Sequence, residues 1–311
     1  MSGEGGERGE GVKGDPEGED GKDTMTDIVA ELLNLLDIEQ LEVDLFRGVG
    51  SGGETSMRIF GGHVIAQALV AAYRTVEDRM CHSLHAYFVR PGDPSIPVIY
   101  QVDQSRDGRS FTTRRVVAIQ HGKQILNMSA SFHVEEESWH HQHAMPDVPG
   151  PEGLKTRQQL REENAHRVSD QRRADYLRRR PIDIREIAPQ DHFDPQPMSD
   201  ANALWFRMEG LPDDLTPRMH QCLLAYASDM NLLASAMRPH GLTWFKRAVM
   251  TASLDHSMWF HGPVDFKNWH LYSMDSPFSG GARGFNRGAI YTREGGLIAS
   301  VAQEGLVRPV K

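Results

Sequence analysis

Apolar residues along this chain follow two different spacings. Residues 26–41, 60–76 and 218–241 carry them every three or four positions, which predicts amphipathic helices. Shorter runs alternate apolar and polar residues and predict strands. The predicted strands are residues 42–48, 81–89, 96–106, 111–120 and 123–134 in the first part of the chain, and residues 181–188, 202–210, 251–261, 268–276, 284–292 and 297–307 in the second.

Short polar turns separate several of these strands. Asp107 with Gly108, and His121 with Gly122, are typical of tight turns, so the strands between residues 81 and 134 are expected to form antiparallel hairpins. The same order of elements returns after residue 180. SLHAYFVRPGD corresponds to SLDHSMWFHGPVD, and SFTTRRVVAIQHGKQI corresponds to GFNRGAIYTREGGLI. The sequence therefore predicts an α+β protein in which one helix-and-sheet unit occurs twice.

Composition divides the chain into four parts. Residues 1–24 are mostly glycine and acidic side chains and predict a disordered tail, because they have too few apolar groups to offset the entropy of ordering. Residues 25–134 and 181–311 hold the two repeated units. Residues 135–180 are rich in charge and proline, and they are expected to form a linker that includes a charged helix over residues 154–180.

Charge and cysteine content restrict the partners and the compartment. The net charge of −9 disfavours nucleic acid as a partner. No apolar run approaches the roughly 20 residues that cross a bilayer, and the N-terminus lacks a secretory pattern, so no membrane partner is expected. Cys81 and Cys222 lie far apart in sequence and indicate free thiols in a reducing compartment, which predicts the cytoplasm.

Two motifs that could bind a cofactor or metal are weak. Gly48, Gly50 and Gly53 match the spacing of a dinucleotide-binding loop, but a strand-like run follows them where a helix should begin, which favours a plain loop. The histidines of residues 140–143 lack the spacing of a metal site and have no cysteine or glutamate framework around them. The sequence therefore predicts no cofactor and no metal.

Asp229 is the residue that suggests chemistry. It falls on the apolar face of the predicted helix 218–241, which Thr216 and Pro217 are expected to begin. A carboxylate in that position needs hydrogen-bond donors, because an unpaired buried charge is costly. The following strands offer Ser253, Asp255, His256, Ser257 and Gln303. Either these groups form a water-activating site, or Asp229 is a structural acid bonded to nearby backbone, and its spacing alone does not decide between the two.

The chain resembles the acyl-CoA thioesterase II (TesB-type) family. The similarity covers residues 28–308 and depends on the strings LFRG, FGGHVIAQAL, HSLHAYFVRPGD, YASDMNLL, DHSMWFH, ARGF and QEGLVR. It implies a tandem, or double, hotdog fold, in which each half is a long helix wrapped by a curled antiparallel sheet. It also implies hydrolysis of acyl-CoA to free fatty acid and CoA, and assembly as a homodimer or homotetramer. Peroxisomal relatives end in a Ser-Lys-Leu-type signal, whereas this chain ends in RPVK, which agrees with the cytoplasm.

The resemblance assigns the catalytic roles to Asp229, Ser253 and Gln303. Some members of the family have threonine where this chain has Ser253, and either side chain supplies the hydroxyl. Asp229 is the expected general base, with Ser253 and Gln303 orienting the attacking water. The first half carries Gln67 instead of an acid, so the second half, residues 181–311, is expected to hold the catalytic residues.

Substrate binding and two other functions complete the hypothesis. The acyl chain is expected in a groove that includes Met230, Leu233 and Trp259. A hotdog dehydratase is one alternative, and it would use His63 or His256 on a hydroxyacyl thioester. A non-catalytic acyl-CoA-binding protein is the other. A nucleophilic serine is disfavoured because no G-x-S-x-G motif is present.

Overall fold

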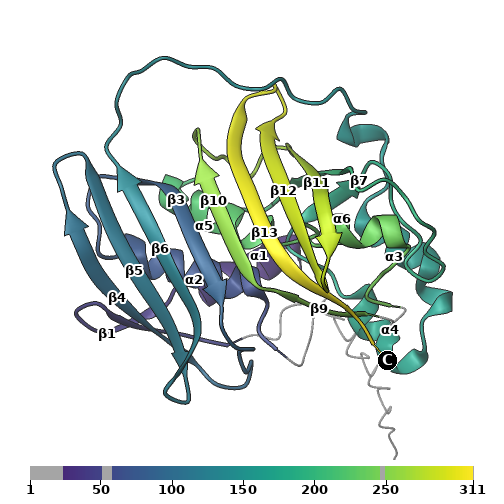
Figure 1. Ribbon diagram of the computed structural model, residues 1–311, viewed down its shortest axis with the longest axis horizontal. Coiled ribbons are helices and arrows are strands. Elements are labelled where there is room, and N and C mark those ends of the chain that lie inside the picture. The colour runs from purple at the N-terminus through teal and green to yellow at the C-terminus, as the bar shows by residue number, and fades with distance from the viewer. Residues whose placement is uncertain (1–23, 51–57, 246–248, 311) are drawn as a thin grey trace, which may run out of the picture.

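The computed structural model describes residues 24–50, 58–245 and 249–310 (Figure 1). The predicted tail, apart from Thr24, lies outside the described residues. Thr24 is instead the N-cap of the first helix: its hydroxyl accepts the Asp27 N–H, and the Asp27 carboxylate accepts the Thr24 N–H. This capping box begins the helix at Met25, slightly earlier than the pattern predicted.

The described strands form one 13-stranded sheet. The first half contributes α1 (Met25–Leu36), β1 (Glu39–Glu42), β2 (Leu45–Gly48), α2 (Gly61–Tyr73), β3 (Met80–Phe88), β4 (Val98–Asp107), β5 (Phe111–Gln120) and β6 (Lys123–His133). The second half contributes β7 (Asp183–Glu186), β8 (Asn202–Arg207), α5 (Pro217–Ser228), α6 (Ala234–Met237), η3 (Arg238–His240), β9 (Val249–Ser253), β10 (Asp255–Phe260), β11 (His270–Gly280), β12 (Arg283–Thr292) and β13 (Leu297–Pro309).

The two halves share this sheet through the antiparallel pair β3 and β10. The spatial order is β1-β2-β4-β5-β6-β3-β10-β13-β12-β11-β8-β7, with β9 paired to β13. The predicted hairpins β4–β5 and β5–β6 are confirmed. The expectation that β3 is also part of a consecutive hairpin is wrong, because β3 pairs with β6 and β10 and so closes the junction between the halves.

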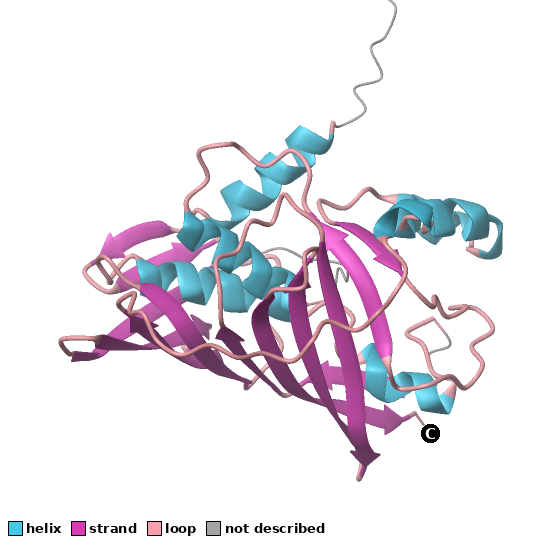
Figure 2. Ribbon diagram, turned by 90° about the horizontal axis from the view of Figure 1, so that it is seen from above, coloured by secondary structure: helices cyan, strands magenta, loops and turns pink. Residues whose placement is uncertain are grey.

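The long helices α2 and α5 pack against each other on one side of the sheet (Figure 2). Ala66, Ala68, Ala71 and Ala72 of α2 are all buried, and such small side chains permit a close approach of neighbouring elements. One continuous apolar cluster extends from α1 across both central helices to β13. The double hotdog is thus built as two repeats around one shared core.

The predicted helix 218–241 is interrupted. The α5 helix ends at Ser228, and Asp229 is its C-cap. Asn231 then adopts a left-handed backbone with φ of 65°, a conformation that asparagine tolerates better than most residues. The chain resumes as α6 and the 3₁₀ turn η3. Asp229 therefore lies at a helix end, where its carboxylate can reach groups from several elements.

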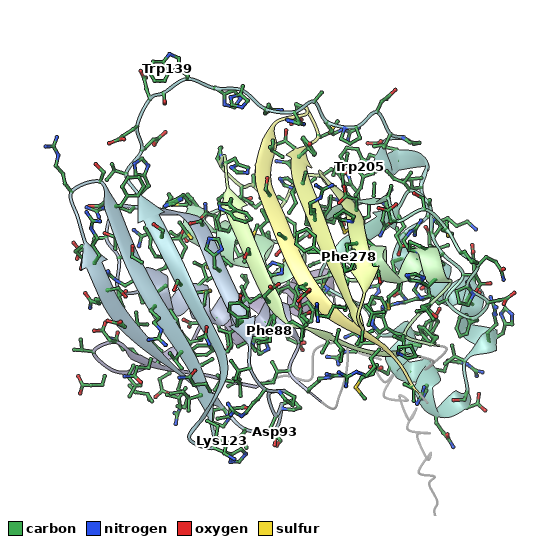
Figure 3. All side chains as sticks on the ribbon, in the orientation of Figure 1. Phe88, Asp93, Lys123, Trp139, Trp205 and Phe278 are labelled. Atoms are coloured by element: carbon green, nitrogen blue, oxygen red, sulfur yellow. The ribbon has the colours of Figure 1, made fainter. Side chains whose placement is uncertain are left out.

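The linker between the halves runs as an extended segment past the ends of the central strands (Figures 1 and 3). Trp139 is fully exposed there, whereas Trp205 of β8 donates its indole N–H to the Pro149 carbonyl. The single charged helix predicted over residues 154–180 is wrong. Two short helices, α3 (Arg157–Asn164) and α4 (Asp170–Leu177), occur instead, joined by the turn η2 (Ala165–Arg167) and preceded by η1 (Pro151–Gly153). Val168 between them is buried, so tertiary contact interrupts the pattern.

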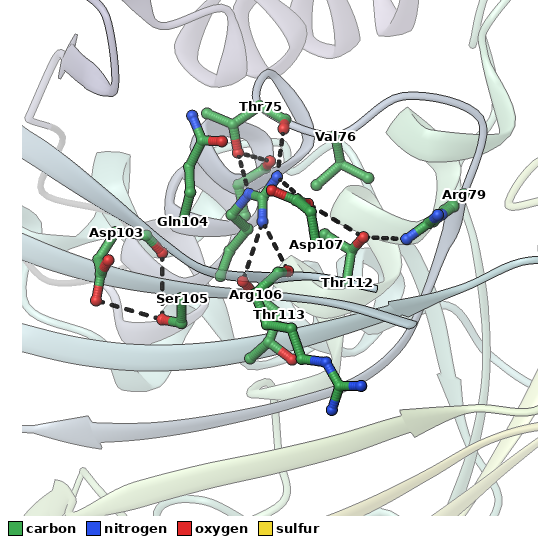
Figure 4. Close-up of polar contacts among 12 residues, drawn as sticks. Thr75, Val76, Arg79, Asp103, Gln104, Ser105, Arg106, Asp107, Thr112 and Thr113 are labelled. Carbon is green, nitrogen blue, oxygen red and sulfur yellow. Dashed lines mark hydrogen bonds and ion pairs between the residues drawn. The ribbon is translucent and has the colours of Figure 1, made fainter. Parts of the chain in front are cut away.

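A buried arginine fixes the far end of α2. Arg114 of β5 donates to both the hydroxyl and the carbonyl of Thr75, each at 2.9 Å, and to the Asp107 carboxylate at 2.8 Å (Figure 4). Thr112 joins the same network and accepts a hydrogen bond from Arg79. Because Thr75 lies two residues beyond the end of α2, this network holds the helix against the β4–β5 hairpin at the end opposite Asp229.

Candidate active site

Asp229 accepts hydrogen bonds from both halves of the protein. Its Oδ1 accepts from Gln303 Nε2 at 2.6 Å and from the Ser253 hydroxyl at 3.2 Å. Its Oδ2 accepts from the backbone N–H of Gly62 at 2.9 Å. The structure therefore brings together all three residues that the sequence predicted, and it adds a backbone donor that no pattern in the sequence indicated.

The donor from the first half comes from the N-terminus of α2. Phe60 is the N-cap and has no side chain that can bond the free N–H groups of the first turn. The Asp229 carboxylate instead accepts the N–H of Gly62. Gly61 lies just before it, and a Cβ at Gly61 would come within 2.6 Å of Asp229 Oδ2 and 2.9 Å of the Phe88 ring. Glycine at position 61 thus leaves room for the carboxylate.

Ser253 and Gln303 reach Asp229 from neighbouring strands. The predicted strand 251–261 is divided at Leu254, whose N–H donates to the Glu304 carbonyl and whose carbonyl accepts from Phe88. Ser253 is the last residue of β9, beside this break. Gln303 lies on the inner face of β13 and is 1% exposed. The break lets the hydroxyl of Ser253 point to the helix end.

His256 extends the polar contacts beyond Asp229. Its Nδ1 lies 3.1 Å from Gln303 Nε2, and its Nε2 lies 2.9 Å from the Ser228 hydroxyl. His256 is fully buried, and burial lowers its pKa, although nearby Asp229 acts in the opposite direction. Burial therefore favours the neutral form of His256. From the sequence His256 was only a possible partner, because its inward direction depends on the register of β10.

The other polar residues of this strand point away from the site. Asp255 accepts the Glu304 N–H, and Ser257 bonds the exposed His85 across the β3–β10 junction. No hydrogen bond joins the side chains of His256 and Asp255, so this neighbouring acid does not support the dehydratase hypothesis. His63 is also buried, and burial lowers its pKa to about 4, although a contact with the Gln67 side chain acts in the opposite direction.

A small, mostly apolar cavity of about 10 Å³ lies between the end of α5 and the strands at the far edge of the second half, next to residues that flank Asp229 in the chain. Its lining residues are Ile182, Ile184, Leu204, Phe206, Ala227, Met230, Asn231 and Tyr272. Of these residues only Met230 was expected from the sequence, since most of the others come from strands whose neighbours the local pattern does not reveal.

Two residues that were expected in the acyl groove lie elsewhere. Leu233 packs in a separate cluster with Ala236, Met237 and Val307. Trp259 faces the outside of the sheet, where its ring contacts His85 edge to face. Alternation along β10 explains this, because His256 and Met258 point inward and leave Trp259 on the opposite face.

Residues 24–50, 58–245 and 249–310 contain no group of three or more candidate ligands that could hold a metal ion. His140, His141 and His143 lie exposed in the extended linker. No helix in these ranges is long and apolar enough to cross a membrane.

Family models match both halves of the chain. Residues 52–133 match an acyl-CoA thioesterase N-terminal domain, and residues 173–306 match an acyl-CoA thioesterase model. Acyl-CoA thioesterase 2 of Haemophilus influenzae is 37% identical over 91% of this chain and 99% of its own length. Acyl-coenzyme A thioesterase 8 of Homo sapiens is 40% identical over 96% of this chain and 93% of its own.

Solved structures give the same relationship. The acyl-CoA thioesterase II TesB2 of Mycobacterium marinum is 39% identical, with a TM-score of 0.72, and the match covers 90% of this chain and 99% of that one. The tesB protein of Mycobacterium avium subspecies paratuberculosis is 30% identical, with a TM-score of 0.73, and the match covers 91% of this chain and 100% of that one. Identity at this level over nearly the whole of each chain shows that this protein belongs to the acyl-CoA thioesterase II family.

Proposed function

We propose that this protein hydrolyses fatty acyl-CoA to free fatty acid and CoA, using a water held by Asp229, Ser253 and Gln303. Asp229 takes a proton from the water while the water oxygen bonds to the thioester carbonyl carbon. The C–S bond then breaks, and the CoA sulfur leaves as a thiolate that takes up the proton held by Asp229. The observation that carries this proposal is the carboxylate of Asp229, held by three donors at the end of α5.

The hydrogen bonds of Gln303 indicate how the water is oriented. Its amide nitrogen faces both Asp229 and His256, so both amide hydrogens are used. Its Oε1 is buried and has no hydrogen-bond partner among the described residues. A water that donates one hydrogen to this oxygen and the other to Asp229 keeps a lone pair free for attack. Gln303 thus acts as an acceptor toward the water.

The oxyanion that develops on the carbonyl requires donors. The first N–H groups of α2 have no acceptor within the helix, and Asp229 takes only that of Gly62. The N–H groups of Gly61 and His63 lie on either side of it in the chain. We assign oxyanion stabilisation to this helix end, where backbone donors are fixed before the reaction and the helix dipole favours negative charge.

The acyl chain is placed against the apolar residues that line the small cavity beside Asp229, which must move apart to admit it, because about 10 Å³ holds about one water. Of these residues, Met230 directly follows Asp229, and Tyr272 donates its hydroxyl to the carbonyl of Ser228, the residue before Asp229. Ile184 lies on β7, at the edge of the sheet. An apolar lining with few polar groups suits an alkyl chain and excludes water from the thioester.

Asp229→Asn tests the proposal. The substitution keeps the volume but removes the proton acceptor, so turnover of medium-chain and long-chain acyl-CoA should fall about 10²–10⁴-fold with substrate binding retained. Thermal unfolding and CoA release with a thiol reagent are measured together. An Asp229→Asn variant that is folded and retains near-normal turnover would contradict the role of Asp229 as base.

Ser253→Ala and Gln303→Ala test the shared water. Each should reduce turnover less than Asp229→Asn, because these residues position the water and do not take its proton. Their double variant should lose less than the product of the single losses, since both act on one water. Strictly multiplicative losses would indicate separate roles.

The two alternative functions give different products. Binding of acyl-CoA without CoA release would identify a binding protein, and an enoyl product from a hydroxyacyl-CoA would identify a dehydratase.

We also propose a cytoplasmic location, supported by the free thiols of Cys81 and Cys222. Assembly as a homodimer or homotetramer remains a prediction, for which sedimentation of the purified protein is the measurement.

A further inference from the structure

We propose that His256 is a positioning residue for hydrolysis: as the neutral Nε2–H tautomer, fixed by Ser228, it holds the Gln303 amide in the orientation that binds the water. The proposal rests on the hydrolytic function above and adds a residue to it. It depends on the distances along one buried chain of groups, which runs from α5 through β10 to β13 and back to the end of α5.

The tautomer of His256 follows from the hydroxyl of Ser228. This hydroxyl has one hydrogen, which it donates to the Ala225 carbonyl at 2.9 Å. The Ser228 oxygen can therefore only accept from His256 Nε2, which lies 2.9 Å away. His256 must carry its proton on Nε2, which leaves Nδ1 as an acceptor.

The orientation of Gln303 follows in turn. An acceptor at His256 Nδ1 requires a donor 3.1 Å away, and the carboxylate of Asp229 requires a donor at 2.6 Å. Only the NH₂ group of Gln303 satisfies both acceptors, so the amide cannot be flipped. Its Oε1 must then point in the remaining direction, where it is buried without a partner among the described residues.

His256 restrains the Gln303 amide more fully than Asp229 alone can. The carboxylate fixes one amide hydrogen of Gln303, but the plane of the amide could still turn about its last side-chain bond. The Nδ1 of His256 is a second acceptor, and it removes this freedom. His256 is fully buried and lies on β10, the strand between β3 and β13. Burial also lowers the pKa of His256, which keeps Nδ1 available as an acceptor.

Two substitutions separate this role from general packing. His256→Leu removes both ring nitrogens, and we expect kcat to fall about 10–100-fold with KM changed less than about 3-fold. His256→Asn keeps an acceptor oxygen near the place of Nδ1, so kcat should return to within about 5-fold of the parent. His220→Asn is the matched control, because His220 is also buried and accepts a backbone N–H, from Phe266, away from Asp229.

A double-variant cycle shows whether His256 acts through Gln303. In a Gln303→Ala background, adding His256→Leu should lower kcat by less than about 3-fold, since the amide that it positions is gone. Equal losses in both backgrounds, or equal kcat for the Leu and Asn variants, would overturn the proposal. Thermal unfolding of each variant separates misfolding from loss of positioning.

A measurement without turnover separates this proposal from the hydrolytic one. Nitrogen-15 NMR of histidine-labelled protein distinguishes the two tautomers, and comparison with His256→Asn assigns the resonance. We expect His256 to be protonated on Nε2 and not on Nδ1. A proton on Nδ1 would overturn the proposal even if the protein hydrolyses acyl-CoA. If His256 has the expected tautomer but the parent protein does not hydrolyse acyl-CoA, the proposed function is wrong.

Discussion

The backbone N–H of Gly62 and the carboxylate of Asp229 are joined by a 2.9 Å hydrogen bond, although they lie 167 positions apart and in different halves of the chain. The start of α2 is thus completed by the end of α5. Because a donor of one repeat holds the acid of the other, neither repeat contains the whole site. The first half contributes backbone donors and space, and the second half contributes the side chains.

The space at the start of α2 leads to a prediction for Gly61→Ala. Alanine favours helices over glycine, so helix propensity alone would predict a stabilised protein. The added Cβ would instead come within 2.6 Å of Asp229 Oδ2, and kcat should fall about 10-fold or more as the carboxylate is displaced. Gly153→Ala is the control, since nothing lies within 4 Å of its added Cβ. Unchanged turnover in Gly61→Ala would show that Asp229 has more freedom than its contacts indicate.

The cavity beside Asp229 leads to a prediction for chain length. Ile184 is 6% exposed and lines the cavity from the edge strand β7. Ile184→Ala should move the optimum of kcat/KM toward longer acyl chains, and Ile184→Phe should move it toward shorter ones. Rates are measured over a series of acyl-CoAs. Ile298→Ala, buried in the core outside the cavity lining, should lower stability without moving the optimum.

The capping box of α1 leads to a prediction for the N-terminus. Deletion of residues 2–22 should leave turnover and Tm unchanged, because the predicted tail has almost no apolar side chains. Thr24→Ala should lower Tm by about 2–4 °C through loss of the cap. A lower Tm after the deletion would mean that the tail contacts the folded protein.

Burial of His63 leads to a pH prediction. Its pKa is about 4 when folded and 6.5 in the unfolded chain, so only the unfolded chain takes up the proton between these values. The unfolding free energy should therefore fall as pH decreases from 6.5 to 4, by roughly 2–3 kcal/mol from this residue. His63→Gln should remove that part of the slope. His141→Gln, in the exposed linker, should leave the slope as it is.

Much of the fold could be predicted from periodicity and turns. The alternating runs predicted the strands because side chains on a strand alternate between its two faces, and His121 with Gly122 marked a real hairpin. The correspondence between the two halves predicted the duplication. Asp229 was recognised because an acid on an apolar helical face is rare, and the resemblance supplied Ser253 and Gln303.

Tertiary structure decided the rest of the site. Which strands lie side by side depends on contacts between distant segments, so neither the β3–β10 junction nor the Ile184 side of the cavity could be predicted from local pattern. The predicted helix stops at Ser228, and Asn231 beyond it adopts a left-handed backbone, an interruption that the apolar spacing did not indicate. The sequence by itself determined most of the strands and the two central helices, and it singled out Asp229 as the candidate acid. Packing placed Gly62 against Asp229 and His256 against Gln303, because hydrogen bonds between distant segments form only once the shared core has brought those segments together.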